Sequence, residues 1–516
     1  MNFISTAPVV RLTKAFATPY RNVVATAKTC YSSKGIVEDS QVGEREKFAP
    51  LAQSIYEAGH HTTFQHAHFQ FAMENVSRHF LWSFLHSHPF YNSEQVSQRY
   101  VTVKPDTVAI PELPARQAAI YRECVELMFE AYQRLCLMLA APARAEFYKR
   151  FNHSERMEKK HAKSIEKRSQ EAARYILPVA THAYLYHTVS GLTLLRYYRL
   201  ANQFDTPSEQ RVVLQKMVDE LLSFDRDYEI TLQQPMDAEA LPEFQFFAGR
   251  GDANANHSRA FCEEFDGDLA GLTSKLIAFP QNGERLVADA VREILGLPTA
   301  ALGDEEAIRM AADPGVNRVL GDSLNLTTIH KLSRALCHPH FTFKKKISHA
   351  ADSQDQRHRM TPGSRPILAA HMHDAPDFET PQLIAIDEAS HRFYKETMAR
   401  VWEKIAALRR EGAPPEALAY LLPNAASIRF TESSDFLNLR HKHQMRLCYN
   451  AQEEIWKASV EEARQIRDVL PLLGSFLLPP CGVRAAAKQK PICPEGPRYC
   501  GVRVWKLDLG EYERVI

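Results

Sequence analysis

The chain has 516 residues, of which 45% are hydrophobic and 24% are charged, and its formal net charge is only +1. These values are those of an ordinary globular protein, and a charge so close to zero provides no bulk field for nucleic acid or for an anionic membrane surface. No apolar run approaches the ~20 residues of a membrane-spanning helix. Nine scattered cysteines and the lack of a signal-peptide core in residues 1–14 indicate a cytoplasmic protein without a disulfide framework.

Helical patterns dominate the first half of the chain. Gly59 suits the position just after a helix, because glycine adopts the left-handed backbone that ends many helices. From His68 to Met73 aromatic and polar residues alternate, which predicts a half-buried strand. The charged run 153–170 is interpreted as a solvated helix face or loop. The predicted helices cover 15–34, 46–58, 76–85 and 114–140, with further helical segments up to residue 226.

The second half repeats the order of the first. Helical segments at 265–296 and 304–337 precede a short strand, Phe341–Phe343, and a long helix follows Pro381. The segment from Glu416 to Pro423 is identical at five of eight positions to the segment from Glu171 to Pro178. Such repetition indicates a duplicated module. The sequence therefore predicts two related domains in tandem. The predicted ranges are 1–250, 259–470 after a small, polar linker at 248–258, and a Cys- and Pro-containing extension at 471–516.

Arg357, His358 and Arg359 form a cationic group of three consecutive residues in the second half. Two planar guanidinium groups flank an imidazole, downstream of the strand Phe341–Phe343. Because arginine presents a fork of donors that fits phosphates and carboxylates, we interpret this segment as an anion-binding corner at the end of a strand. A solvated charge run is the alternative.

These residues, with others, resemble the flavin-dependent thymidylate synthases, the ThyX family. That family carries Arg-His-Arg followed by Ser-x-Arg-Tyr, and a Gly-His-x-Thr-x-Phe-x-His segment before a Phe-x-Phe strand. It also carries an Ala-Arg-x-x-Leu-Pro segment and a C-terminal arginine-bearing helix. In this chain the motifs are distributed: Gly59–His66, Ser97–Tyr100 and Ala173–Pro178 lie in the first half, and Gln354–Arg359 and Arg440–Ile455 in the second.

Each half departs from the family pattern where the other keeps it. The first half has His86-Ser87-His88 where Arg-His-Arg is expected. The second half lacks Ser-x-Arg-Tyr after Arg359, and Ala419 stands where the first half has Arg174. The resemblance implies an α+β fold of two tandem domains that form a pseudo-dimer, each domain a small antiparallel sheet with long helices. It also implies homotetramers with active sites between subunits, so a fused pair of copies needs only one side of the cleft from each. We therefore predict one composite nucleotide site within the chain, and a homodimer that rebuilds the tetramer.

The resemblance also implies the chemistry. The substrate is expected to be dUMP, with methylenetetrahydrofolate as carbon donor, and NADPH as reductant of FAD. Arg446 is expected to be catalytic, stabilising negative charge on the uracil ring. The expected dUMP-binding residues are Ser97, Arg99, Arg174, Gln354 and Arg446, and the expected FAD-binding residues are His60, Thr62, Arg357, His358, Arg359 and His441.

No metal site is expected. His60, His61, His66 and His68 lie in one segment, but no acidic residue stands near them, so polar or flavin contacts are favoured over a metal cluster. In the extension, Cys481, Cys493 and Cys500 lack the paired spacing of a zinc ribbon, and no fourth ligand is evident. Buried or free thiols are the favoured interpretation there, and a structural metal the alternative.

Two other functions remain compatible with these residues. One is a flavin- or nucleotide-binding relative without methyl transfer, acting as a sensor or a structural partner. The other is a flavin enzyme that modifies a different uracil-like substrate.

Overall fold

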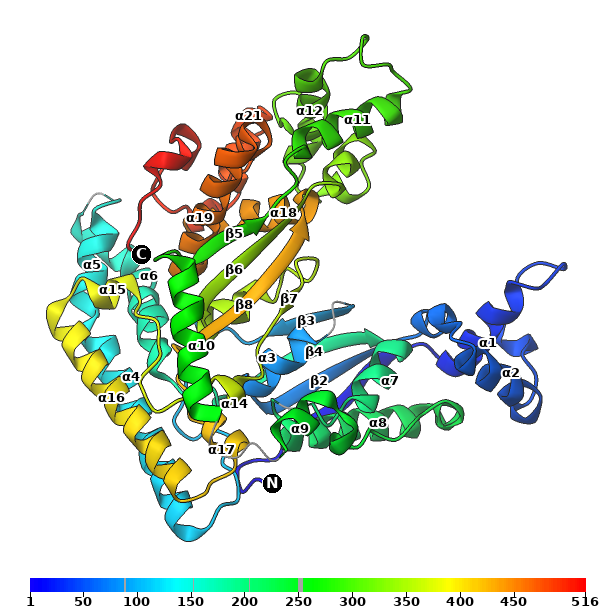
Figure 1. Ribbon diagram of the computed structural model, residues 1–516, viewed down its shortest axis with the longest axis horizontal. Coiled ribbons are helices and arrows are strands. Elements are labelled where there is room, and N and C mark those ends of the chain that lie inside the picture. Colours follow the sequence, from blue (N-terminus) through cyan, green and yellow to red (C-terminus); the bar gives the residue numbers. More distant parts are fainter. Residues whose placement is uncertain (88–89, 152, 204, 249–253) are drawn as a thin grey trace.

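The computed structural model describes every residue except 88–89, 152, 204 and 249–253 (Figure 1). Its core is two four-stranded antiparallel sheets with the same strand order. The first runs β1 (Val9–Ala15), β2 (His68–Ser77), β4 (His182–Ser190), β3 (Tyr91–Gln95). The second runs β5 (Ser274–Ala278), β6 (His340–Ser348), β8 (Ser427–Asp435), β7 (Gly363–Ser364). The predicted α+β class with a small antiparallel sheet in each half is confirmed.

Helices surround the sheets in an order that also repeats. The first half contains α1 (Pro19–Thr29), α2 (Arg45–Glu57), α3 (Arg78–His86), α4 (Ala115–Met138), α5 (Ala140–Tyr148), α6 (Glu155–Ala173), α7 (Gly191–Arg199), α8 (Pro207–Phe224) and α9 (Pro242–Phe247). The second half contains α10 (Asn254–Leu269), α11 (Gly283–Leu295), α12 (Asp304–Ala312), α13 (His349–Asp355), α14 (Leu368–His371), α15 (Gln382–Ala385), α16 (Glu388–Arg410), α17 (Pro415–Tyr420), α18 (Phe436–Arg446) and α19 (Glu453–Val469). The extension contains α20 (Pro471–Gly474) and α21 (Pro480–Ala486).

The two copies align without insertion over their last third. Strand β4 and strand β8 each have nine residues, and their ends differ by a constant offset of 245 residues, from His182 to Ser427 and from Ser190 to Asp435. Each strand leads directly into a helix, α7 or α18, capped by the side chain of its own last residue. The central strands β2 and β6 likewise end in a serine, Ser77 or Ser348, that caps the next helix.

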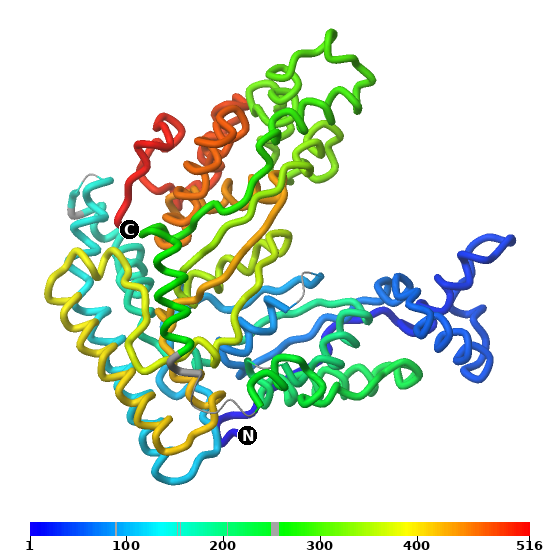
Figure 2. Tube along the Cα trace, in the orientation of Figure 1, coloured from blue at the N-terminus to red at the C-terminus, as the bar shows by residue number. Residues whose placement is uncertain are grey.

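Long helices and backbone hydrogen bonds join the halves. Helix α4 of the first half packs along α16 of the second, at one edge of the molecule in Figure 1. Between the sheets, Val179 N donates to Leu422 O at 2.9 Å and Asn424 N donates to Leu177 O at 2.8 Å. These bonds link the two copies of the repeated eight-residue segment. Figure 2 shows the C-terminal segment, in red, returning past the first-half helices α5 and α6.

Two reciprocal buried hydrogen-bond groups bind the same interface. Tyr175 Oη donates to Glu454 Oε2 at 2.5 Å, and Ser348 Oγ donates to that oxygen at 2.5 Å. In the mirrored group Tyr420 Oη and Ser77 Oγ each donate to Glu209 Oε2 at 2.6 Å. Each glutamate thus ties a serine of its own half to a tyrosine of the other, and the contacts realise the predicted pseudo-dimer within one chain.

Several sequence predictions of local structure were wrong. Residues 182–190, assigned to a helical region, form the central strand β4, in which Ala183, Leu185, His187 and Val189 are buried and the residues between them are exposed or half-buried. This period-two alternation is the signal that was overlooked. The predicted helix 265–296 contains strand β5, the predicted helix 15–34 is shortened to α1 beside β1, and the polar segment after residue 90 begins with β3.

Other predictions held in part. The charged run 153–170 belongs to helix α6, and Gly59 has the left-handed φ of 78° expected after a helix. The linker predicted at 248–258 lies partly outside the described residues, and α10 begins within it. The domain boundaries themselves stay a prediction. Among the described residues, no helix is long and apolar enough to cross a membrane.

The reciprocal tyrosines provide a test of the interface. Replacing Tyr175 or Tyr420 by phenylalanine removes one donor from a buried carboxylate, which costs about 1–3 kcal/mol. We expect each variant to lower the free energy of unfolding by that amount, and the double variant to lower it by the sum, measured by urea denaturation. Tyr228→Phe is the control, because the buried Tyr228 hydroxyl has no hydrogen-bond partner among the described residues. Equal losses in all three variants would contradict the assignment.

The buried glutamates also predict a pH dependence of stability. Burial raises the pKa of Glu209 to about 7 in the folded chain. The folded state therefore holds a proton that the unfolded state releases above pH ~4.5, so this contribution to stability is present at low pH and is lost as the pH rises through about 7. We expect the stability of Glu209→Gln relative to the unmodified chain to rise by up to about 3 kcal/mol between about pH 5 and about pH 8. A pH-independent difference would contradict this.

Candidate functional site

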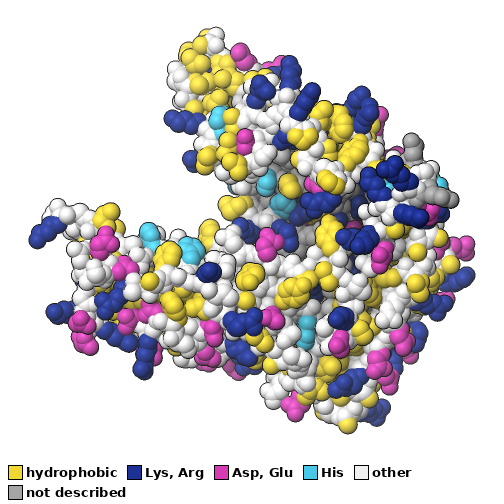
Figure 3. Space-filling model, turned by 180° about the vertical axis from the view of Figure 1, so that it is seen from behind, with side chains coloured by type: hydrophobic (Ala, Val, Ile, Leu, Met, Phe, Trp, Pro, Cys, Tyr) yellow, Lys and Arg dark blue, Asp and Glu magenta, His cyan; other side chains and the backbone are white. Residues whose placement is uncertain are grey.

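Two adjoining cavities lie between the halves. The larger, about 810 Å³, is bordered by β3, β4 and α7 on one side and by α18 and the segment after α13 on the other. The smaller, about 390 Å³, opens beside it, and Arg357, Met445 and Arg446 line both. Figure 3 shows a hollow between two projecting arms, with Lys, Arg and His side chains around it. Each cavity is therefore built from both halves of the chain.

Local structure places the predicted residues on these walls. Arg357, His358 and Arg359 follow the short helix α13, which separates them from strand β6, so they lie after a helix and not at the end of a strand as predicted. Arg446 is the last residue of α18. Arg174 begins a 3₁₀ turn after α6.

The smaller cavity gathers all five predicted nucleotide-binding residues. They are Ser97, Arg99 and Arg174 from the first half, and Gln354 and Arg446 from the second. Arg446 Nη2 donates to Gln354 O at 2.6 Å, which fixes the guanidinium against α13. Arg174 Nε and Nη2, Arg446 Nε and Gln354 Nε2 are buried and have no hydrogen-bond partner among the described residues. Buried donors without partners are costly, so an anionic or carbonyl-bearing ligand would satisfy them.

Arg99 differs, because protein groups already hold it. Its Nε donates to Glu171 Oε1 at 2.8 Å, and its Nη2 donates to Asn450 O of the other half at 3.0 Å. Burial alone would raise the pKa of Glu171, but Arg99, Arg168 and Arg174 together lower it to about 2. Glu171 is therefore an anion at neutral pH that orients Arg99 toward the cavity.

Arginine crowding makes the smaller cavity strongly cationic. Burial, and then Arg357 and Arg99, lower the pKa of Arg446 to about 10, although Asp355 opposes the shift. Arg78, which the sequence analysis did not single out, also lines this cavity. Burial, with Arg174 and Arg357, lowers its pKa to about 9. A bound dianion would relieve this mutual repulsion.

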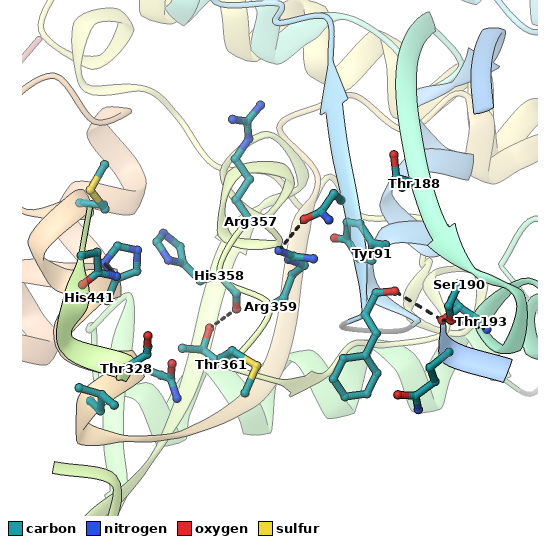
Figure 4. Close-up of a pocket in the computed structure, with 18 of the residues that line it drawn as sticks. Tyr91, Thr188, Ser190, Thr193, Thr328, Arg357, His358, Arg359, Thr361 and His441 are labelled. Carbon is teal, nitrogen blue, oxygen red and sulfur yellow. Dashed lines mark hydrogen bonds between the residues drawn. The ribbon is translucent and has the colours of Figure 1, made fainter. Parts of the chain in front are cut away.

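The larger cavity holds the Arg-His-Arg segment opposite first-half residues (Figure 4). Arg359 Nη2 donates to Asn92 Oδ1 of β3 at 3.3 Å. His358 Nε2 is buried without a partner among the described residues, and burial with the nearby Arg446 holds the His358 pKa well below its usual range. A neutral imidazole beside two guanidinium groups can donate to or accept from a ligand. His441 lies on the same wall, with its Nδ1 3.2 Å from Asn325 Nδ2.

A buried ionic cluster supports this wall from behind. Lys442 Nζ lies 2.9 Å from Asp355 Oδ1 and also contacts Glu432, and Lys345 Nζ lies 2.8 Å from Glu462 Oε1. At the corresponding positions the first half has apolar and aromatic residues and one histidine. When the two copies are aligned with the bulge in β2 taken into account, these residues are Met73, Phe84, His187, Tyr197 and Met217, which are all buried. The half that keeps Arg-His-Arg is the half with charges beneath it.

Two predicted residues lie elsewhere. His60 and Thr62 are exposed beside the arm formed by α1 and α2, and line neither cavity, although Gln65 and His68 from the same segment line the larger one. Arg78 could have been found as a basic residue at the start of an otherwise apolar helix. Asn325 lies in a segment with no motif that marks it.

The chain is similar in sequence to known proteins. The sequence model of the family described as "Thymidylate synthase complementing protein" matches residues 11–224 and 275–472. A flavin-dependent thymidylate synthase of Clostridium tetani is 29% identical over 193 residues, covering 37% of this chain and 72% of its own length. One from Geobacter sulfurreducens is 29% identical over 167 residues, covering 32% and 69%.

Solved structures with some similarity include a UMP/dUMP methylase, PolB, from Streptomyces cacaoi. It is 17% identical, with a TM-score of 0.32, and the match covers 45% of this chain and 96% of that one. The thymidylate synthase ThyX of Helicobacter pylori, solved with FAD and dUMP, is 14% identical with a TM-score of 0.30, covering 44% and 97%.

Proposed function

This chain belongs to the thymidylate synthase complementing protein family, and from that premise we propose that it is an FAD-dependent thymidylate synthase. It methylates dUMP to dTMP with methylenetetrahydrofolate and NADPH. The observation that carries the proposal is the meeting of two half-sites: the predicted nucleotide residues of both halves line one cavity, which adjoins the cavity of the Arg-His-Arg segment.

The smaller cavity binds dUMP in this proposal. Arg174, with two unpaired nitrogens, and Arg99, oriented by Glu171, bind the phosphate, and the Ser97 hydroxyl donates to it. Bidentate guanidinium contacts suit a phosphate dianion. Gln354 Nε2 donates to a carbonyl of the uracil ring. The arginine excess of the cavity supplies the long-range attraction that the net charge of +1 cannot.

Arg446 is the catalytic residue in this proposal. Its Nη2 is held by Gln354 O while its Nε remains free for the uracil edge. A guanidinium at that edge stabilises negative charge on the ring when C5 becomes nucleophilic, and its burial away from solvent strengthens the effect. Its lowered pKa of about 10 still leaves it charged at neutral pH.

The larger cavity fits FAD. Its volume of about 810 Å³ lies within the usual range of cofactor sites, about 300–1,000 Å³. Arg357 and Arg359 hold the pyrophosphate, and His358 and His441 contact the flavin ring region. FAD, when bound and reduced by NADPH, supplies the hydride for the methylation.

The exposed His60 and Thr62 assist from a second copy of the chain, because neither lines the cavities of its own chain. The proposed assembly is therefore a homodimer with two composite sites. Each site takes its nucleotide residues from one chain and receives His60 and Thr62 from the partner.

Flavin content and tritium release test the function. The purified chain is expected to show flavin absorbance and to release tritium from dUMP labelled at C5 when methylenetetrahydrofolate and NADPH are supplied. Arg446→Ala should lower that release by roughly 10²–10³-fold, since one preorganised donor is lost. Arg392→Ala, an exposed change on α16, is the control. A colourless protein, or an Arg446→Ala variant as active as this control, would overturn the proposal.

Mixed dimers test how the sites are composed. Two differently tagged variants are co-expressed and the doubly tagged species is purified. Arg174→Ala with Arg446→Ala should remain inactive, because each chain spoils its own site. His60→Ala with Arg446→Ala should recover about half of the activity per dimer, since the chain that keeps Arg446 receives His60 from its partner. Rescue in the first pair would show that nucleotide sites form between chains.

A further inference from the structure

Four free cysteines come together around one small cavity beside the nucleotide cavity. Cys481, Cys493 and Cys500 of the extension line a small cavity together with Cys448, which follows α18. Cys448 lies 33 positions before Cys481, so its place in this group was invisible in the sequence spacing. The fold thereby supplies the fourth thiol that the extension lacks.

The four thiols are half-buried, and Cys448, Cys493 and Cys500 all lie close enough to Cys481 to interact with it electrostatically. The Cys500 thiol donates to Val502 O at 3.5 Å, and the backbone of Asn450 and of Gly482 hydrogen-bonds the sulfurs of Cys448 and Cys481. Backbone N–H groups that face a sulfur stabilise the thiolate, which is the form of cysteine that binds a metal.

The extension also needs a cross-link. From residue 471 onward it contains only short helices and 3₁₀ turns, with α21 the longest at seven residues. Segments with so little regular structure are commonly held by disulfides or metals. All nine cysteines are free thiols, so a disulfide does not serve here.

We propose that Cys448, Cys481, Cys493 and Cys500 ligate a thiolate-bound metal centre that fastens the extension to the end of α18. Both zinc and iron–sulfur clusters take four cysteine thiolates. The metal analysis below distinguishes the two. Among the described residues, Cys262, His373 and Asp377 form a tighter group, with ligand atoms within 4.8 Å of one another.

That tighter group is not the better site. Arg429 Nη1 and Nη2 donate to the two carboxylate oxygens of Asp377 at 2.6 and 3.0 Å. The carboxylate is thus already neutralised by a guanidinium, and a metal there would meet a positive charge. The four-cysteine group has no such competitor on its sulfurs in the described part of the chain.

The metal centre would act on the nucleotide cavity through the extension. Cys448, Pro480, Glu495 and Arg498 all line that cavity. Asn450, two residues after Cys448, accepts from Arg99 through its carbonyl and donates to Arg498 O at 2.6 Å through its side chain. Fixing the extension therefore fixes the carbonyl that orients Arg99.

Metal and sulfide analysis of the full chain, purified without oxygen, tests the site. We expect about four iron and four sulfide per chain for a cluster; one zinc without sulfide would support the same ligands with the other metal. Cys481→Ser and Cys493→Ser should lose the metal. Cys337→Ser, also half-buried but not lining the cavity of the four cysteines, should keep it. No bound metal, or equal metal in all three variants, would overturn the proposal.

Thiol titration keeps the test decisive if those variants do not fold. The native chain should expose about four fewer reactive thiols before metal removal than after it. Identical counts would overturn the site. A last measurement rests on the proposed function: metal removal should raise KM for dUMP about tenfold, with a smaller effect on kcat. Bound metal in a chain that does not use dUMP would refute the proposed function and leave the metal site standing.

Discussion

Two buried glutamates each accept hydrogen bonds from a serine of their own half and a tyrosine of the other. Glu209 and Glu454 sit at the start of corresponding helices, α8 and α19, so each contact fixes a helix, a sheet end and the opposite half together. Removing a partner from such a group leaves a buried charge or donor unsatisfied, which costs free energy. If the two halves separated, both glutamates would lose a partner in this way. The cavities between the halves exist because this interface holds their walls in register.

The ionic cluster beneath Arg357 is present in one copy of the repeat and replaced in the other. Replacing buried ion pairs with apolar residues often leaves stability unchanged or improves it, and the first half shows such a replacement, with aromatic residues at the corresponding positions. Stability therefore does not explain why the second half keeps Lys345, Lys442, Asp355 and their partners. The charges lie directly under the segment that forms the larger cavity, and they fix the backbone from which Arg357 to Arg359 project. The cluster is better explained by positioning than by stability.

Sequence reasoning found the parts of this protein that short motifs carry. The repeated segment around Tyr175 and Tyr420 indicated the duplication, and the complementary losses indicated a shared cleft. Strand β4 was missed because aromatic and histidine residues in a run flanked by helices obscured its alternation. Arg78 was missed because a lone arginine in an apolar helix has no motif around it. Cys448 could be joined to the other three cysteines only in space, since contacts between distant segments leave no trace in spacing.

The equivalent cleft on the other side of the pseudo-dimer differs from the nucleotide cavity in the residues that line it. By the constant offset between copies, Ala419 replaces Arg174, and Ala201 occupies the position of Arg446. Asp205, at the position of Asn450, accepts from Ser83 Oγ at 3.0 Å and from Leu368 N at 3.1 Å. Burial raises the pKa of that carboxyl to about 6. The first cleft holds cationic donors that have no partner among the described residues. At the corresponding place in the second cleft, the Asp205 carboxyl already accepts hydrogen bonds from protein groups. An anionic ligand would there meet an acid in place of two arginines, so the asymmetry of the sequence becomes an asymmetry of charge, which in the proposed function confines nucleotide binding to one side of the pseudo-dimer.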